Sequence, residues 1–204
     1  MREAARVASV AVTEAMNEYA AGGVTDEPDI TPYLKGHLDS ALRGRVGDLA
    51  WSSTIVRHGK GRAAEENWTG ADLVIHVKID TLTVKYSKGV LIQAKRVEPG
   101  QQMQPAKHAE LIEQCEKMLD ITNQSFVFDY TKSQMRCGSA IRISGSTSRM
   151  LYDLCDTTSY RFFYDLFRCY TGDHRLQNAK VAELPVPTKV YFAARGQFTS
   201  DVQG

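Results

Sequence analysis

The sequence predicts an α/β domain in which helices flank a central mixed β-sheet. Three observations lead to this fold class: helical periodicity in the first 45 residues, short apolar runs between residues 50 and 95, and an apolar helix–strand pair after them. This order of helices, strands, helix and strand is typical of a sheet covered by helices. At 204 residues the chain is long enough to bury a sizeable core, and residues 1–204 are expected to form a single domain.

Two helices are expected before the first strand. The spacing of apolar residues predicts the first helix over 3–21. Thr31 followed by Pro32 is typical of an N-cap with proline in the first helical turn, which predicts a second helix over 32–43. Residues 25–30 are therefore expected to form a polar connector.

The apolar runs that follow are short and predict strands. The first covers residues 50–56, the second 73–79 and the third 90–94. The segment 80–89 between the last two is short enough for a hairpin or a meander. These two strands are therefore expected to be neighbours in the sheet.

The remainder of the chain continues the alternation of helices and strands. A helix is expected over 109–121, a buried strand over 125–130 and a further strand over 140–143. An aromatic-rich helix is expected over 152–170, with its aromatic rings packed in the core instead of stacking on bases. Prolines interrupt the tail, and its last dozen residues are expected to fray.

Composition excludes several classes of protein. A formal net charge of +1 excludes a broadly cationic binder, so any nucleic-acid surface must be a local patch. Without a signal peptide or a long apolar segment, a cytoplasmic protein with no membrane association is expected. Four cysteines lack CxxC spacing and are expected to be reduced core residues: Cys115, Cys137, Cys155 and Cys169.

Polar residues lie at the facing ends of the two neighbouring strands. Asp72 opens the second apolar run, whereas Gln93 and Lys95 close the third and share one face of it, because side chains alternate along a strand. Mg²⁺ prefers oxygen ligands, which Asp72, the Gln93 side chain and the Ala94 backbone carbonyl would supply. Lys95 is expected to hold an attacking water and to offset charge on a phosphorus centre.

Two short segments carry a resemblance to a known family, through these residues: Glu66, Gly70, Ala71, Asp72, Gln93 and Lys95. With the hairpin between them, they resemble the PD-(D/E)XK nuclease superfamily, the restriction-endonuclease-like fold. The variant is the one with a GxD…QxK signature, common among restriction and other prokaryotic defence nucleases. The resemblance covers roughly residues 1–130, so residues 131–204 are expected to elaborate the same domain.

This resemblance implies Mg²⁺-dependent cleavage of DNA phosphodiester bonds, with Mn²⁺ as a substitute ion. Asp72 would be the metal-binding acid, Gln93 would replace the usual Glu or Asp, and Lys95 would be the signature lysine. Two departures stand out, because Ala71 replaces the usual proline and the neutral Gln93 removes one negative charge.

A second acid would compensate for the neutral glutamine. Glu66 is favoured as this further catalytic and metal-binding residue, and three other acids remain alternatives: Glu14, Glu18 and Glu65.

Basic residues near these segments are candidates for binding DNA. Arg57, Lys60 and Arg62 lie in a loop with two glycines, which permits close approach to phosphates, although a solvated turn explains the loop almost as well. Arg96 and Lys107 flank the expected site. A homodimer is a further expectation, because cutting both strands commonly takes two sites. Partner proteins of a defence system are also expected.

Other functions remain open on the sequence alone. The fold could serve as a catalytically inactive nucleic-acid-binding module or structural subunit, which the neutral Gln93 would favour. An RNA-directed nuclease is a further alternative. Asp72 and Lys95 could also form a plain cross-strand ion pair, which contributes little to stability where it is exposed.

Overall fold

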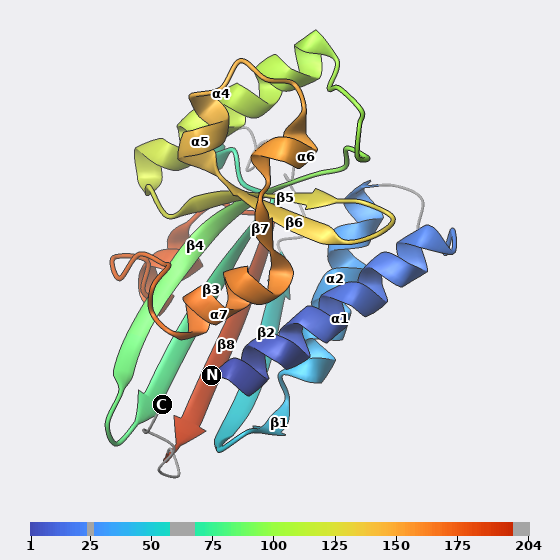
Figure 1. Ribbon diagram of the computed structural model, residues 1–204. Helices are drawn as coiled ribbons and strands as arrows, with labels where there is room; N and C mark the ends of the chain where they lie inside the picture. Colours follow the sequence, from blue (N-terminus) through green and yellow to red (C-terminus); the bar gives the residue numbers. More distant parts are fainter. Residues whose placement is uncertain (24–26, 58–67, 198–204) are drawn as a thin grey trace.

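The computed structural model describes residues 1–23, 27–57 and 68–197. In this part of the chain an eight-stranded mixed sheet has the strand order β1-β2-β8-β3-β4-β5-β6-β7 (Figure 1). The strands are β1 (Gly44–Val46), β2 (Leu49–Arg57), β3 (Leu73–Thr81), β4 (Lys85–Lys95), β5 (Ser125–Tyr130), β6 (Met135–Ser139), β7 (Thr157–Thr158) and β8 (Thr188–Gly196). The helices are α1 (Arg2–Ala20), α2 (Glu27–Ala41), α4 (Pro105–Ile121), α5 (Ala140–Ser144), α6 (Leu151–Leu154), α7 (Ser159–Phe167) and α8 (Asn178–Glu183). The expected α/β class, with helices around a central mixed sheet, is confirmed.

Helices cover both faces of the sheet (Figure 1). On one face α1, α2 and α7 bury alternate residues of β3, among them Ile75 and Val77. On the other face Val74 of β3 and Leu91 of β4 meet Leu111 of α4, and α5, α6 and α8 complete that layer. The central strands therefore carry apolar side chains on both faces, as strands covered on both sides do.

β3 and β4 form the hairpin that the sequence predicts. Their antiparallel register runs from Leu73 opposite Ile92 to Asp80 opposite Lys85. β4 is parallel to β5, and α4 makes the connection between them. β4 begins at Lys85 and not at residue 90, because backbone pairing with β3 continues through four polar or small residues that hydrophobicity alone does not mark as a strand.

The C-terminal strand occupies the middle of the sheet. β8 lies between β2 and β3, antiparallel to the first and parallel to the second (Figure 1). The expected fraying of the last dozen residues is therefore wrong for residues 193–196, while residues 198–204 lie outside the described part. Val190, Phe192 and Ala194 are buried on the face covered by α1. Their alternating pattern indicates a strand, but it is short and follows two prolines, which favour an irregular tail.

The second helix starts earlier than its proline suggests. α2 begins at Glu27, so Pro32 lies inside it and the expected N-cap at Thr31 is wrong. A proline inside a helix removes one hydrogen bond. Ile30 and Leu34 are nonetheless fully buried, and this apolar face holds the first turns against the core.

Two further expectations after residue 130 are corrected. Residues 140–143 form helix α5 and not a strand, since Ala140 and Ile143 are buried at helical spacing, and the preceding strand is β6. The expected helix over 152–170 is divided into α6 and α7 by β7, with Thr158 capping α7 by accepting a hydrogen bond from the backbone N–H of Arg161. Phe162, Phe163 and Phe167 of α7 are buried, as expected, whereas Tyr160 is exposed and Tyr164 is half-buried.

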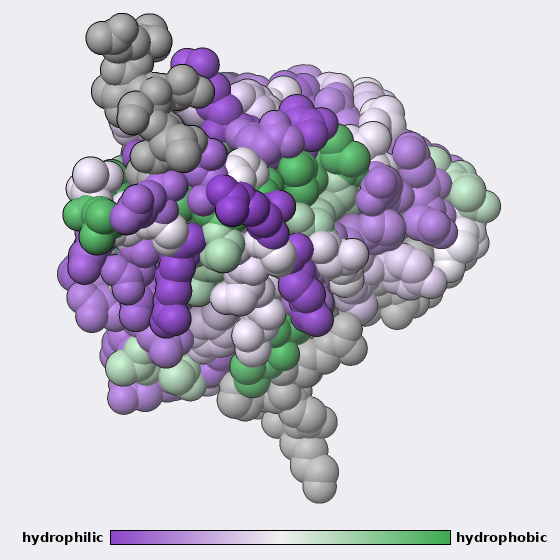
Figure 2. All heavy atoms as spheres, turned by 90° about the horizontal axis from the view of Figure 1, so that it is seen from below, coloured by the Kyte–Doolittle hydropathy of each residue, from purple (hydrophilic) through white to green (hydrophobic). Residues whose placement is uncertain are grey.

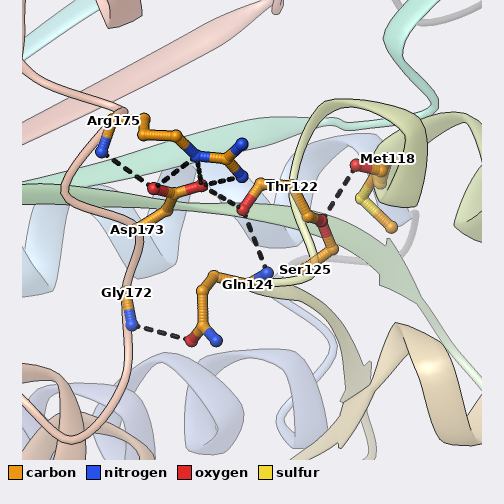
Figure 3. Close-up of polar contacts among 7 residues, drawn as sticks. All are labelled: Met118, Thr122, Gln124, Ser125, Gly172, Asp173 and Arg175. Atoms are coloured by element: carbon orange, nitrogen blue, oxygen red, sulfur yellow. Dashed lines mark hydrogen bonds and ion pairs between the residues drawn. The ribbon is translucent and has the colours of Figure 1, made fainter.

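The segment after α7 is fastened to the start of β5 by polar contacts (Figure 3). The Asp173 carboxylate accepts hydrogen bonds from the Thr122 hydroxyl at 2.7 Å and from the Arg175 guanidinium at 2.7 Å. Nearby, the backbone N–H of Gly172 donates to the side-chain oxygen of Gln124 at 2.8 Å. The hydrogen bonds from Arg175 are the main cause that lowers the pKa of Asp173 from 3.8 to about 2, and the hydrogen bond from Thr122 adds to this shift.

The Asp173→Asn variant should lose part of the acid sensitivity of folding. A carboxylate with a depressed pKa stabilises the fold above its unfolded value of 3.8, and this contribution disappears as the pH falls toward about 2. The free energy of unfolding of the parent should therefore decline more steeply across this window than that of the variant. Urea unfolding at several pH values measures the difference, with the exposed Asp120→Asn as the control. Equal slopes for parent and Asp173→Asn would contradict the prediction.

No helix in the described part of the chain is long and apolar enough to cross a membrane. Seen from the lower end of Figure 1, the surface is mostly hydrophilic, with hydrophobic side chains in small separate groups (Figure 2). All four cysteines are free thiols. Cys115, Cys137 and Cys155 are buried in the core as expected, whereas Cys169 is only half-buried, so the expectation is wrong for that residue.

Candidate functional site

The start of β3 and the end of β4 meet at one edge of the sheet. Asp72 lies one residue before β3, and its backbone N–H donates to the carbonyl of Ile92 at 2.9 Å. Its carboxylate Oδ2 accepts a hydrogen bond from the backbone N–H of Ala94, also at 2.9 Å. Asp72 is only 6% exposed. Backbone pairing of the hairpin therefore fixes this buried carboxylate between the Gln93 and Lys95 positions of β4.

Gln93 presents a buried oxygen that has no hydrogen-bond partner within the described residues. The side chain is fully buried, and its Nε2 donates to the backbone carbonyl of Ala94 at 3.3 Å. Its Oε1 makes no hydrogen bond there. A buried acceptor without a partner costs about 1–3 kcal/mol. An electrophilic partner such as a hard cation would remove this cost, so Gln93 Oε1 is a candidate ligand for one.

Gln93 and Lys95 face the layer formed by α4. Leu91, on the same face of β4, packs in the core beneath this helix, as expected. Lys95 is half-buried, and its charge acts on two residues of α4. The hydrogen bond from Lys107 is the main cause that lowers the pKa of Glu110, and the Lys95 charge adds to it. Burial raises the pKa of the Cys115 thiol to about 12, and the same charge opposes this rise.

Gly70 allows α4 to approach the segment that carries Asp72. Its φ is +70°, and a Cβ at this position would lie 2.2 Å from the backbone oxygen of Gln114. The next turn is held by Thr69, whose hydroxyl accepts a hydrogen bond from the backbone N–H of Ala71 at 3.2 Å. The glycine before the acid therefore has a steric role, because it lets the backbone of α4 contact the entry to β3.

The Gly70→Ala variant should lose about 2–5 kcal/mol of unfolding free energy, because it combines a left-handed backbone with a clash against helix backbone. Gly100→Ala provides a matched control, since Gly100 has φ +77° with no atom within 4 Å of the added Cβ. That control should lose only about 1–2 kcal/mol. Chemical denaturation measures both values. Similar losses for the two variants would show that the contact with α4 is not what requires the glycine.

The structure brings together four of the expected site residues: Asp72, Gln93, Ala94 and Lys95. Several others lie outside the described residues: Lys60, Arg62, Glu65, Glu66 and the side chain of Arg57.

Glu14 of the first helix points away from this edge, toward α2. Glu14 accepts a hydrogen bond from His37 at 3.2 Å, between α1 and α2. These helices cover the face of the sheet opposite to that of α4. Glu18 belongs to the same helix α1.

The two flanking basic residues have intramolecular contacts. Arg96 follows β4, and its guanidinium lies 5.9 Å from the centre of the Tyr19 ring. Lys107 forms an ion pair with Glu110 at 2.8 Å and lies inside α4, which begins four residues before the expected start at 109. Both residues are exposed, so both remain candidates for phosphate contacts.

Sequence reasoning missed the acid of α4 that lies near Lys95. Glu110 is exposed, and its carboxylate interacts electrostatically with the Lys95 ammonium. Pro105 at the first helical position was the signal for an earlier helix start. With that start, Glu110 falls in the second turn, beside the end of β4.

Within the described residues no group of three or more His, Cys, Asp or Glu side chains is placed to hold a metal. The fit to Mg²⁺ therefore depends on one carboxylate and two neutral oxygens. The chain matches no protein-family model, no curated protein and no solved structure.

Proposed function

We propose that this protein is a Mg²⁺-dependent DNA endonuclease with a restriction-endonuclease-like core. One observation carries the proposal. The buried Asp72 carboxylate is bonded to the backbone between Gln93 and Lys95, and the Gln93 oxygen beside it has no hydrogen-bond partner among the described residues. A carboxylate, an amide oxygen and a lysine at one strand edge are a suitable set for cutting a phosphodiester.

Three oxygens of the chain would hold the metal: Asp72 Oδ, Gln93 Oε1 and the Ala94 carbonyl. These are hard ligands, and Mg²⁺ keeps several of its waters when only one or two carboxylates bind it. When bound, Mg²⁺ activates water and stabilises negative charge on the phosphoryl oxygens. Glu66, outside the described residues, is proposed to add a second carboxylate.

In the proposed reaction Lys95 supplies a positive charge. It is not a metal ligand. It is half-buried at the end of β4, on the face that carries Gln93. Its ammonium orients the attacking water and offsets charge that develops on the scissile phosphate. Such a charge is more effective in a partly desolvated site than in bulk water.

The order of elements supports the same core. The β3–β4 hairpin carries the three polar residues, α4 follows, and β5 lies parallel to β4. One feature differs from a simple meander, because β8 separates β2 from β3. This insertion leaves the Asp72 edge intact, since β8 pairs with the opposite side of β3.

DNA is the proposed substrate, and five basic residues are proposed to contact its phosphates: Arg57, Lys60, Arg62, Arg96 and Lys107. A formal net charge of +1 means that acids elsewhere balance this patch. Mn²⁺ is expected to replace Mg²⁺. Action as a homodimer, with partner proteins of a prokaryotic or phage-related defence system, belongs to the same proposal.

Two features favour a second function. The Asp72 carboxylate already accepts a hydrogen bond from Ala94, and the neighbouring Gln93 carries no charge. Both features suit a nucleic-acid-binding module that keeps the fold without cleavage.

Calorimetric titration with Mg²⁺ and Mn²⁺ distinguishes the two functions. The nuclease proposal expects the parent to bind metal and Asp72→Ala to lose binding. Asp120→Ala, which removes an exposed carboxylate from α4, should bind as the parent does. A folded parent that binds DNA but neither metal would overturn the nuclease proposal and support the binding module.

A further inference from the structure

A second cluster of reactive side chains lies on β4, away from the proposed metal site. It is formed by Lys88 on the strand and by Cys169 and His174 on the segment that follows α7. Lys88 precedes Gln93 by five residues, about 16 Å along a strand. The two residues also point to opposite faces, because side chains alternate. This cluster is therefore separate from the Asp72 edge.

Cys169 has an unusual backbone conformation. Its φ is +66°, and among the described residues no other non-glycine residue has a positive φ. This conformation costs roughly 1–2 kcal/mol for a residue with a Cβ. Residues held in such conformations cluster at functional sites, where the surrounding structure fixes them. A glycine at this position would avoid the cost, so the presence of a cysteine there requires an explanation.

The thiol has a proton acceptor within reach. Cys169 Sγ lies 3.4 Å from Nε2 of His174. The His174 ring is exposed, and it contacts the edge of the Tyr86 ring with their centres 6.4 Å apart. Cys169 is half-buried, whereas the other three cysteines are fully buried. Cys169 is thus the thiol that a small molecule can reach.

A buried ammonium completes the cluster. Lys88 is fully buried, and its Nζ donates a hydrogen bond to the carbonyl of Thr171. Burial lowers the pKa of Lys88, and the nearby Cys169 and the Asp165 carboxylate oppose that shift. Asp165 itself is paired with Arg161 at 2.7 Å. A lysine side chain next to a cysteine is one of the surroundings in which reactive thiols occur.

The segment 168–175 is shaped to hold these groups. Gly172 has φ +115°, and a Cβ there would lie 2.8 Å from Cδ of Lys88, so only glycine lets the lysine stem pass. The neighbouring Asp173 is fixed by Thr122 and Arg175, as Figure 3 shows. The backbone that carries Cys169 and His174 is therefore anchored to β4 and to the start of β5.

We propose that Cys169 is a reactive thiol that exchanges with small-molecule disulfides, assisted by His174 and Lys88. Nε2 of His174 accepts the thiol proton, and the Cys169 sulfur attacks one sulfur of the disulfide. A new S–S bond forms as the old one breaks, and the departing thiolate takes the proton from His174. Electrons and protons balance without a further reactant. Lys88 holds the negative charge on sulfur before the bond forms.

Oxidised glutathione tests the proposal when the folded, fully reduced protein is followed by intact-mass measurement and peptide mapping. One glutathione should add per native chain, at Cys169, faster than to free cysteine under the same conditions. Cys169→Ser should not react. His174→Asn should slow the reaction at least about tenfold. His37→Asn, a change of the same kind at a histidine paired with Glu14, should react at the parental rate.

Lys88→Met provides a second arm, with the exposed Lys85→Met on the same strand as its control. The Lys88 variant should also react more slowly than the parent. If it fails to fold, the His174 variant still decides, because that ring is exposed. Reaction of Cys169 no faster than free cysteine, or parental rates in His174→Asn, would overturn the proposal and leave a purely structural cluster.

Discussion

Replacing Lys95 with alanine should lower the rate of Mg²⁺-dependent DNA cleavage by a factor on the order of 100 or more, because charge stabilisation at a reacting centre contributes several kcal/mol. Metal binding should be kept, since Lys95 is not a ligand in the proposed site. The measurement is single-turnover cleavage of a labelled duplex, together with a calorimetric Mg²⁺ titration of the same protein.

Lys85→Ala is the matched control for this change. Lys85 begins β4, is exposed, and pairs with Asp80 at 3.5 Å, far from the proposed site on the same strand. It should cleave at the parental rate. A Lys95→Ala protein that melts normally and cleaves as fast as the parent would show that the site is assigned to the wrong lysine.

In the proposed site Gln93 stands where a carboxylate ligand would add a charge, and its variants should separate into two groups. Gln93→Glu should tighten Mg²⁺ binding, because a charge is added at close range, and cleavage should survive. Gln93→Leu, which has a similar size but no oxygen, should lose metal binding and cleavage together. The experiment is a Mg²⁺ titration of the cleavage rate for parent and both variants.

Stability measurements on the same three proteins add a readout that is independent of cleavage. Gln93→Leu removes a buried oxygen that lacks a hydrogen-bond partner in the described structure, but it also removes the hydrogen bond to the Ala94 carbonyl, so its melting temperature without metal should stay close to that of the parent. Gln93→Glu places a second carboxylate beside Asp72, which should lower the melting temperature until Mg²⁺ is added. A leucine variant that titrates like the parent would show that Gln93 is not a ligand.

The hairpin at the proposed site could be predicted because its signals are local. The apolar runs of β3 and β4 are short but rich in aliphatic residues, and the polar residues lie at their ends. Asp72, Gln93 and Lys95 meet because antiparallel pairing places Leu73 opposite Ile92. The α/β class followed from the same kind of pattern.

Long-range pairing is what the sequence did not reveal. β8 lies between β2 and β3 although more than 100 residues separate it from each along the chain. Its alternating residues indicate a strand, but no local feature says where that strand inserts. The missed helix start at Glu27 has a similar cause, since burial of Ile30 outweighs the signal from Pro32.

Cys169 shows the same limit at the level of a site. Nothing in the spacing of the cysteines separated it from the three core residues, and His174 has no metal-ligand spacing. The backbone turns at Cys169, where φ is +66°, and His174 lies beside the thiol. Lys88 reaches the thiol because this segment packs against β4. Only the folded chain places these groups together.

The most direct test of the nuclease proposal is incubation of supercoiled plasmid with the purified protein and Mg²⁺. The parent should convert the plasmid to nicked and linear forms, and EDTA should stop the reaction. Asp72→Ala should leave the plasmid supercoiled while melting as a folded protein. A folded parent that leaves the plasmid supercoiled with both Mg²⁺ and Mn²⁺, or an Asp72→Ala protein that cuts at the parental rate, would contradict the proposed function.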